Sequence, residues 1–214
     1  MREKIISIIN QKGGVGKTTT VINLAAGLSL QEKKVLVIDL DPQGNATTGL
    51  GLSNLENSEK SIYSVLNGTK KISDVIEKTN FENLDLITSN VDLSGLEVET
   101  AGDNRRAFIL KEQIMAYLND SGGTYSHILI DCPPSLSLLT IMALVASDSL
   151  LVPLQTEFFA LEGVTQLMKT IERIKNNLNP ELSIRGILLT MYDKRNKLSG
   201  QVEKEARDYF KDKV

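Results

Sequence analysis

Hydrophobic and polar residues alternate along this chain in two different rhythms. Short runs of Ile, Val and Leu, typical of strands that are buried on both faces, are separated by longer stretches in which apolar residues recur at helical spacing. The short runs predict strands at 5–10, 35–39, 84–89, 127–131, 149–154 and 184–190. The longer stretches predict helices at 17–31, 61–66, 71–78, 105–119, 136–146, 160–177 and 199–211.

This order of elements predicts an α/β fold: a doubly wound, mostly parallel sheet with helices on both faces. Crossover connections in such a sheet are right-handed, and ligands bind beyond the carboxyl ends of the strands. The chain has 214 residues and no internal repeat, and domains commonly run to roughly 100–200 residues. We therefore expect residues 1–214 to form a single domain.

Composition narrows the class of protein. The formal net charge of −3 does not favour binding to nucleic acid through the overall charge, so a DNA contact would need a local patch or an assembled surface. Cys132 is the single cysteine, which excludes an internal disulfide and a thiolate zinc cluster and agrees with a reducing cytosol. The longest uncharged stretch, 132–147, is shorter than the ~20 residues that a membrane helix needs. We expect a soluble, cytoplasmic protein.

The segment "GGVGKTTT" (13–20) lies between the first expected strand and a helix, the context that a phosphate-binding loop requires. Its glycines allow positive φ, so that successive N–H groups can point into one concavity at the start of the helix. Lys17 can reach the β- and γ-phosphates, and the Thr18 hydroxyl can bind Mg²⁺. A chance glycine-rich turn explains this order of elements poorly. The expected nucleotide-binding residues are Lys12, Gly13, Gly14, Val15, Gly16, Lys17, Thr18 and Thr19.

The loop departs from the common form at its start. Five positions before Gly16, where that form has glycine, this chain has Gln11, and Lys12 follows. The segment "KGGVGKTT" resembles the deviant Walker A motif of the ParA/MinD family of P-loop ATPases. The resemblance implies ATP and Mg²⁺ as cofactors, and a homodimer in which Lys12 reaches the phosphates held by the other subunit. A second ammonium there would offset charge on the transferring phosphoryl group, as an arginine finger does.

Acidic residues end two of the expected strands. Taken alone, Asp41 in "DLDPQGNAT" (39–47) either caps a turn or orients a water molecule at the carboxyl end of a strand. The segment resembles the same stretch of the family, which implies that Asp41 activates water, that Asp39 supports the metal site, and that 41–51 is a nucleotide-sensing switch. In "HILIDCPPS" (127–135), the form of a Walker B strand, Asp131 would hold Mg²⁺ directly or through water. The expected catalytic residues are Lys12, Lys17 and Asp41.

The resemblance covers nearly the whole chain, since 151–171 and 186–210 are similar to the ParA/Soj chromosome-partitioning branch. It implies a slow ATPase whose ATP-bound dimer binds nucleoid DNA without sequence preference and is released when a ParB-type partner stimulates hydrolysis. The segment "YDKRNK" (192–197) is either a solvated loop or, by resemblance, the DNA contact, through Lys194, Arg195 and Lys197. Family members usually continue beyond the position of Val214, so a C-terminal strand and a basic loop are expected to be lacking.

Other function classes fit the sequence less well. A MinD-like ATPase positioned on membranes needs a basic amphipathic C-terminal helix, whereas 199–214 carries four acidic residues. An iron–sulfur carrier of the same superfamily needs paired cysteines, and a regulatory GTPase needs an Asn-Lys-x-Asp guanine reader. The chain has neither. A nucleotide-binding scaffold without turnover stays open at this point.

Overall fold

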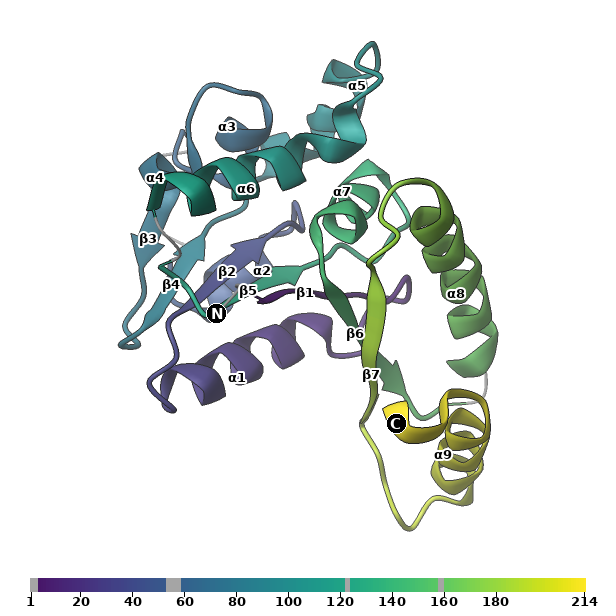
Figure 1. The fold of residues 1–214 in the computed structure, drawn as a ribbon. Helices are drawn as coiled ribbons and strands as arrows, with labels where there is room; N and C mark the ends of the chain where they lie inside the picture. Colours follow the sequence, from purple (N-terminus) through teal and green to yellow (C-terminus); the bar gives the residue numbers. More distant parts are fainter. Residues whose placement is uncertain (1–3, 53–58, 122–123, 158–159) are drawn as a thin grey trace.

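A single seven-stranded sheet with the order β3-β4-β2-β5-β1-β6-β7 organises the chain (Figure 1). The computed structural model describes residues 4–52, 59–121, 124–157 and 160–214. The strands are β1 (Lys4–Ile8), β2 (Val35–Asp39), β3 (Ile76–Lys78), β4 (Leu84–Ile87), β5 (His127–Asp131), β6 (Ser149–Gln155) and β7 (Ser183–Thr190). The helices are α1 (Lys17–Ser29), α2 (Asn45–Gly49), α3 (Ile62–Leu66), α4 (Ile72–Val75), α5 (Leu96–Glu99), α6 (Ile109–Ser121), α7 (Leu138–Ala146), α8 (Ala160–Asn177) and α9 (Lys197–Phe210).

The six expected strands are confirmed, each within two residues at either end, and all of their mutual pairings are parallel. The expected helix 71–78 is wrong in its second half. The chain leaves α4 after Val75 and forms β3, which pairs antiparallel with β4. Sheet pairing overrides a short helical pattern here because Ile76 gains a cross-strand partner that the local sequence does not reveal.

Shorter elements account for the other differences. The sequence did not predict α2, α5 or the 3₁₀ turns at Val91–Gly95, Arg106–Phe108 and Lys211–Lys213, and such short elements have too few residues to show a period. The expected helix 105–119 starts later, because a 3₁₀ turn precedes α6. The remaining helices lie where the spacing of apolar residues put them, within two residues.

Helices cover both faces of the sheet, which confirms the doubly wound prediction (Figure 1). On one face, Val21 and Ala25 of α1 are buried against β-strand residues such as Val35 and Val37. On the other face, α3, α4, α6, α7, α8 and α9 contribute to a larger apolar cluster. Fully burying an aliphatic side chain contributes about 1.5–3 kcal/mol, so both faces hold the sheet firmly. Within the described residues, no helix has the length and apolar character needed to cross a membrane.

Strand register aligns three strand ends in one row. β5 lies between β1 and β2, and Asp131 at its end is level with Ile8 of β1 and Asp39 of β2. Because these strands are parallel, the segments that follow them all leave the sheet at the same edge. The phosphate-loop segment and both expected strand-end carboxylates are therefore brought together by the hydrogen-bond ladder itself.

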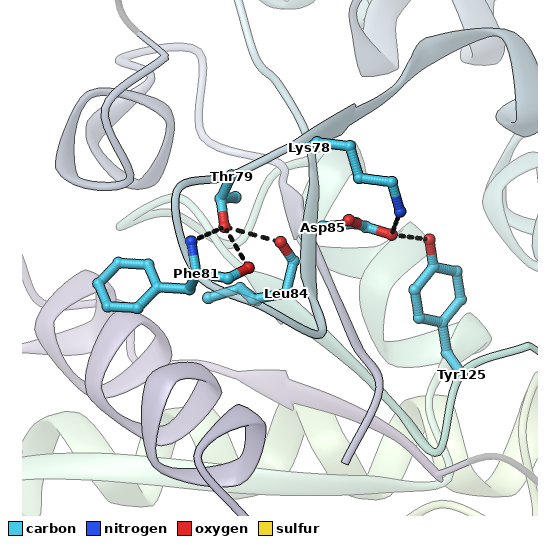
Figure 2. A network of polar contacts seen from close by, with 6 residues as sticks. All are labelled: Lys78, Thr79, Phe81, Leu84, Asp85 and Tyr125. Atoms are coloured by element: carbon cyan, nitrogen blue, oxygen red, sulfur yellow. Dashed lines mark hydrogen bonds and ion pairs between the residues drawn. The ribbon is translucent and has the colours of Figure 1, made fainter. Parts of the chain in front are cut away.

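A side-chain network fastens the antiparallel edge of the sheet (Figure 2). Asp85 Oδ2 on β4 accepts hydrogen bonds from the Tyr125 hydroxyl at 2.6 Å and from Lys78 Nζ at 2.7 Å. The Thr79 hydroxyl donates to the carbonyl oxygen of Leu84 at 2.7 Å, closing the turn between β3 and β4. A three-residue edge strand has few ladder hydrogen bonds, so these side chains supply much of what holds it.

We expect Tyr125→Phe to destabilise the protein by about 1–3 kcal/mol, because it removes a hydrogen bond to a charged, largely buried carboxylate. The measurement is urea unfolding followed by circular dichroism. Tyr209→Phe is the matched control, since the Tyr209 side chain is exposed, and it should shift stability by less than about 0.5 kcal/mol. Equal stabilities of the two variants would contradict an anchoring role for the network.

Candidate phosphate-binding site

The loop between β1 and α1 has a backbone that only glycine adopts readily. Gly14 has φ +75° and Gly16, which precedes α1, has φ +90°, both in the left-handed region. A Cβ atom placed at Gly14 would meet no protein atom within 4 Å, so packing against the protein does not require glycine there. The backbone conformation is therefore what favours glycine at position 14. The space beside this residue is open and lies near the N-terminus of a thirteen-residue helix. This is the geometry of an anion-binding concavity.

The three residues before the glycines fasten the loop to its neighbours. Asn10 donates from Nδ2 to the carbonyl oxygen of Pro153 at 2.7 Å and accepts from the Lys12 backbone N–H at 3.0 Å. Gln11 donates from Nε2 to the carbonyl oxygen of Gly163, in α8, at 2.8 Å. A glycine at position 11 could not make this bond. The glutamine at position 11, where the common motif has glycine, thus has a structural role in anchoring the loop to α8. The sequence showed only that the residue differs from the motif.

The two lysines of the loop lie in contrasting surroundings. Lys17 is only 7 % exposed, and its Nζ donates to the carbonyl oxygen of Lys12 at 3.0 Å. Burial lowers the pKa of Lys17, and the nearby carboxyl groups of Asp131 and Asp41 act in the opposite direction. The Lys12 side chain is 48 % exposed and forms an ion pair with Glu157. The Lys17 ammonium is enclosed beside acidic residues, whereas the Lys12 ammonium lies away from them, on Glu157.

Asp131 is a fully buried carboxyl group whose pKa is strongly raised. Neither carboxylate oxygen has a partner that meets full hydrogen-bond geometry among the described residues, although the Thr18 hydroxyl lies close enough to act on it. Burial raises the pKa of Asp131 to about 7, with further upward contributions from Asp39 and Asp41, whereas Thr18 and Lys17 lower it. An unpaired buried carboxylate is unfavourable unless a cation compensates it. The oxygen ligands Mg²⁺ prefers are available here, from Asp131 and the Thr18 hydroxyl, so the residues fit this ion.

A cage built from protein ligands alone is not found in the described part of the chain, where no three His, Cys, Asp or Glu side chains gather to hold a metal. Mg²⁺ characteristically keeps several waters and binds through one or two protein groups together with substrate phosphates. The sparse ligand set around Asp131 and Thr18 suits that mode of binding.

Asp39 holds the segment after β2 in place. Its Oδ2 accepts from both the backbone N–H and the hydroxyl of Thr47 at 2.7 Å, and its Oδ1 accepts from the Asp41 N–H at 3.2 Å. Burial raises the pKa of Asp39 to about 6, partly offset by these hydrogen bonds. The Thr47 hydroxyl in turn accepts from the N–H of Ser89, after β4. The sequence analysis did not identify Thr47 as a site residue, although it is the last residue of the segment "DLDPQGNAT".

Asp41 lies beside the phosphate loop with its side chain held in a turn. It is largely buried, and its Oδ1 accepts from the Gln43 N–H at 3.0 Å. The structure therefore brings together Lys17, Asp41 and Asp131, with Asp39 level with Asp131 on the next strand. It does not bring the Lys12 ammonium into this cluster.

Of the basic residues expected to touch DNA, Lys194 and Arg195 lie in the loop after β7 and Lys197 is the first residue of α9; all three are exposed. Arg195 makes a two-point contact with Asp193, from Nε at 3.0 Å and from Nη2 at 2.9 Å, so its charge is partly compensated locally. Thr190, at the end of β7, donates to the carbonyl oxygen of Val15 at 2.8 Å. This contact ties the strand that precedes the basic loop to the phosphate loop.

A cavity of about 610 Å³ lies at the amino ends of the parallel strands, beside the network of Figure 2. It is lined by Lys34, Asn83 and Tyr125, which precede parallel strands, and by residues of the turn between β3 and β4. Ligands of doubly wound sheets bind at the carboxyl ends of the strands, where the glycine loop and the unpaired carboxylate lie. We therefore assign the functional site to the carboxyl edge, despite the size of this cavity.

Asp131→Asn should stabilise the ligand-free protein by about 1–3 kcal/mol at pH 8, because it removes a buried charge without a partner. The pKa of Asp131 is about 7 in the fold and about 4 in the unfolded chain, so the carboxylate destabilises the fold fully above pH 7 and not below pH 4. The gain should therefore shrink from pH 8 to pH 5. Urea titrations at both pH values measure it.

The exposed Asp120→Asn variant, on α6, is the control for that experiment and should show little change at either pH. A loss of stability in Asp131→Asn at pH 8 would mean that the carboxylate is satisfied by the protein, contrary to the contacts of the folded chain.

Sequence relatives cover almost the entire chain. A family model described as an AAA domain matches residues 3–184. The chromosome partitioning protein ParA of Caulobacter vibrioides is 50% identical over 211 residues, which cover 99% of this chain and 78% of that protein. The sporulation initiation inhibitor protein Soj of Bacillus subtilis is 48% identical over 211 residues, covering 99% of this chain and 81% of that protein.

Solved structures share the fold. A cobyrinic acid a,c-diamide synthase from Mycobacterium smegmatis, crystallised with bound ADP and magnesium, has a TM-score of 0.90 and 36% identity, covering 98% of this chain and 83% of that one. A plasmid partition protein from Borrelia burgdorferi has a TM-score of 0.84 and 28% identity, covering 100% of this chain and 88% of that one. The similarity therefore holds in both sequence and fold.

Proposed function

The chain belongs to the ParA/Soj family of chromosome-partitioning ATPases, and we propose that it works as an ATP-dependent dimer that binds DNA without sequence preference and is released by hydrolysis. The observation that carries this proposal is the separation of the two lysines. Lys17 is buried beside Asp41 and Asp131, whereas the half-exposed Lys12 side chain lies outside this cluster, in an ion pair with Glu157, from which it could turn to a second subunit.

ATP with Mg²⁺ is the proposed ligand of the site. The Mycobacterium smegmatis relative was crystallised with ADP and magnesium, and also with an ATP analogue and magnesium. In this chain, residues 12–19 would surround the phosphates, and Thr18 and Asp131 would hold the metal, Asp131 through water. The bound metal supplies positive charge to the β- and γ-phosphates. Its charge would also compensate the Asp131 carboxylate, which is unpaired within the described residues.

The chain's own residues would carry out the hydrolysis step. Lys17 would exchange the carbonyl oxygen of Lys12 for phosphate oxygens, a short move for an ammonium already inside the loop. Asp41, held at the loop by its turn, would orient the attacking water and accept its proton. Lys12 of the second subunit would stabilise the charge that develops on the transferred group. Cleavage would then remove the ligand that both subunits share.

We expect Asp41→Ala to form a dimer with ATP that persists, because nucleotide binding is kept while hydrolysis falls by about 10²-fold or more. Lys12→Ala and Lys17→Ala should stay monomeric, since each removes a charge that holds the triphosphate. Size-exclusion chromatography with light scattering measures this, with ADP as the control nucleotide. A monomeric Asp41→Ala would contradict the switch mechanism, and dimers of Lys12→Ala equal to those of the unsubstituted protein would contradict action across the interface.

DNA release by a ParB-type partner is the second part of the proposal, supported by family membership and by the exposed basic loop. Contacts to DNA phosphates release counterions, so the logarithm of the affinity falls with the logarithm of the salt concentration by about 0.9 per contact. Asp193 compensates part of the charge of Arg195, and DNA phosphates would compete with it for the guanidinium.

Neutralising Arg195 and Lys197 together should weaken DNA binding by the ATP-bound dimer and flatten its salt slope by about one unit for each side chain that binds a DNA phosphate. Fluorescence anisotropy with a DNA duplex, at several salt concentrations, measures both. Lys33→Gln is the control and should leave the slope unchanged, because Lys33 is exposed before the amino end of β2, away from the carboxyl ends of the strands. An unchanged slope in the double variant would contradict the DNA contact, and binding to anionic vesicles in its place would favour a MinD-like role.

A further inference from the structure

Glu157 is the partner of Lys12 in the unassembled subunit. It lies two residues beyond the end of β6, and its carboxylate forms an ion pair with the Lys12 ammonium. The Oε1 atom of Glu157 is buried and has no partner of hydrogen-bond geometry among the described residues. The Lys12 charge is therefore what compensates this carboxylate.

Hydrogen bonds hold the backbone at Glu157 beside the phosphate loop's neighbouring strands. The Glu157 N–H donates to the carbonyl oxygen of Gln155 at 2.9 Å. The Thr156 N–H donates to the carbonyl oxygen of Thr190 at 3.4 Å, and the Thr156 hydroxyl shares a hydrogen bond of 3.0 Å with the Ser199 hydroxyl of α9. Lys12 has the longer and more exposed side chain of the pair, so its stem can turn away.

On the proposed mechanism, Lys12 leaves Glu157 in order to reach the triphosphate held by a second subunit. Each subunit that enters a dimer must break this ion pair, and the buried carboxylate oxygen then loses its compensating charge. We propose that Glu157 is a positioning residue that restrains Lys12 in the free subunit and so raises the ATP concentration at which dimers form. This inference rests on the proposed function, because it assumes that Lys12 acts across the interface.

The expected effect is moderate, since Lys12 is half-exposed and solvent screens the pair. Partly exposed ion pairs of this kind change equilibria by about twofold to fivefold. Two lysines are released in each dimer, so Glu157→Gln should lower the dimer dissociation constant by about fourfold to 25-fold. Glu157→Asp, which keeps the charge on a shorter arm, should lie between Glu157→Gln and the unsubstituted protein.

The first measurement concerns the ligand-free subunit and does not depend on dimer formation. A small amine-acylating reagent is applied, and the rate at which Lys12 is modified is followed by mass spectrometry, relative to exposed Lys33 in the same sample. An ammonium held by a carboxylate reacts slowly, so Glu157→Gln should speed modification of Lys12 by about twofold to fivefold. An unchanged ratio would overturn the restraint, whatever the protein does with ATP.

The second measurement is dimer formation by light scattering across a range of concentrations of a non-hydrolysable ATP analogue. Glu157→Gln should form dimers at lower analogue concentration than the unsubstituted protein, and Lys12→Gln with Glu157→Gln should behave as Lys12→Gln alone. Glu112→Gln, which removes the exposed partner of Arg105 on α6, is the matched control and should change nothing. Dimerisation that is unchanged or weaker in Glu157→Gln would overturn the proposal.

The two measurements separate the possible failures. If the unsubstituted protein forms no dimer with the analogue, the proposed function fails, while the acylation rates still decide whether Glu157 restrains Lys12. If the unsubstituted protein dimerises and Glu157→Gln does not dimerise more readily, the proposed function stands and this inference fails.

Discussion

A buried negative charge, without a partner of full hydrogen-bond geometry in the described part of the chain, is the constraint around which this site is arranged. Strand register places Asp131 between β1 and β2, level with Asp39, where the surrounding strands exclude water from it. The same register places the glycine loop at the adjoining strand end. The protein therefore holds together, at one edge, a carboxylate that requires a cation and a backbone concavity that suits an anion. A metal–phosphate ligand would satisfy both requirements at once.

The two lysines of the loop lie in different environments. Lys17 is buried beside Asp131 and Asp41, and Lys12 forms an ion pair with Glu157. The loop that carries them is fastened to the rest of the sheet by Asn10, Gln11 and Thr190, so its shape is set before a ligand arrives. The two lysine side chains, by contrast, end in different surroundings, one buried and one half-exposed.

Much of the architecture could be read from the sequence because it depends on local pattern. Buried strands give continuous aliphatic runs and α1 follows a recognisable glycine loop, so both were predicted nearly to the residue. The antiparallel strand β3 could not be predicted, because three residues carry no period and the strand forms through pairing with β4. The contacts of Thr47, Gln11 and Glu157 were also hidden, since each is made with a residue distant along the chain or on another element.

The sequence by itself determined the fold class, the phosphate loop and the identity of the acidic strand ends, because each is written in neighbouring residues. The tertiary structure alone decided the charge state and partners of those residues. Burial raises the pKa of Asp131, and the approach of the segment after β6 gives Lys12 its counter-ion. Electrostatic energies depend on distance and on access to water, and folding sets both among residues that lie far apart in the chain.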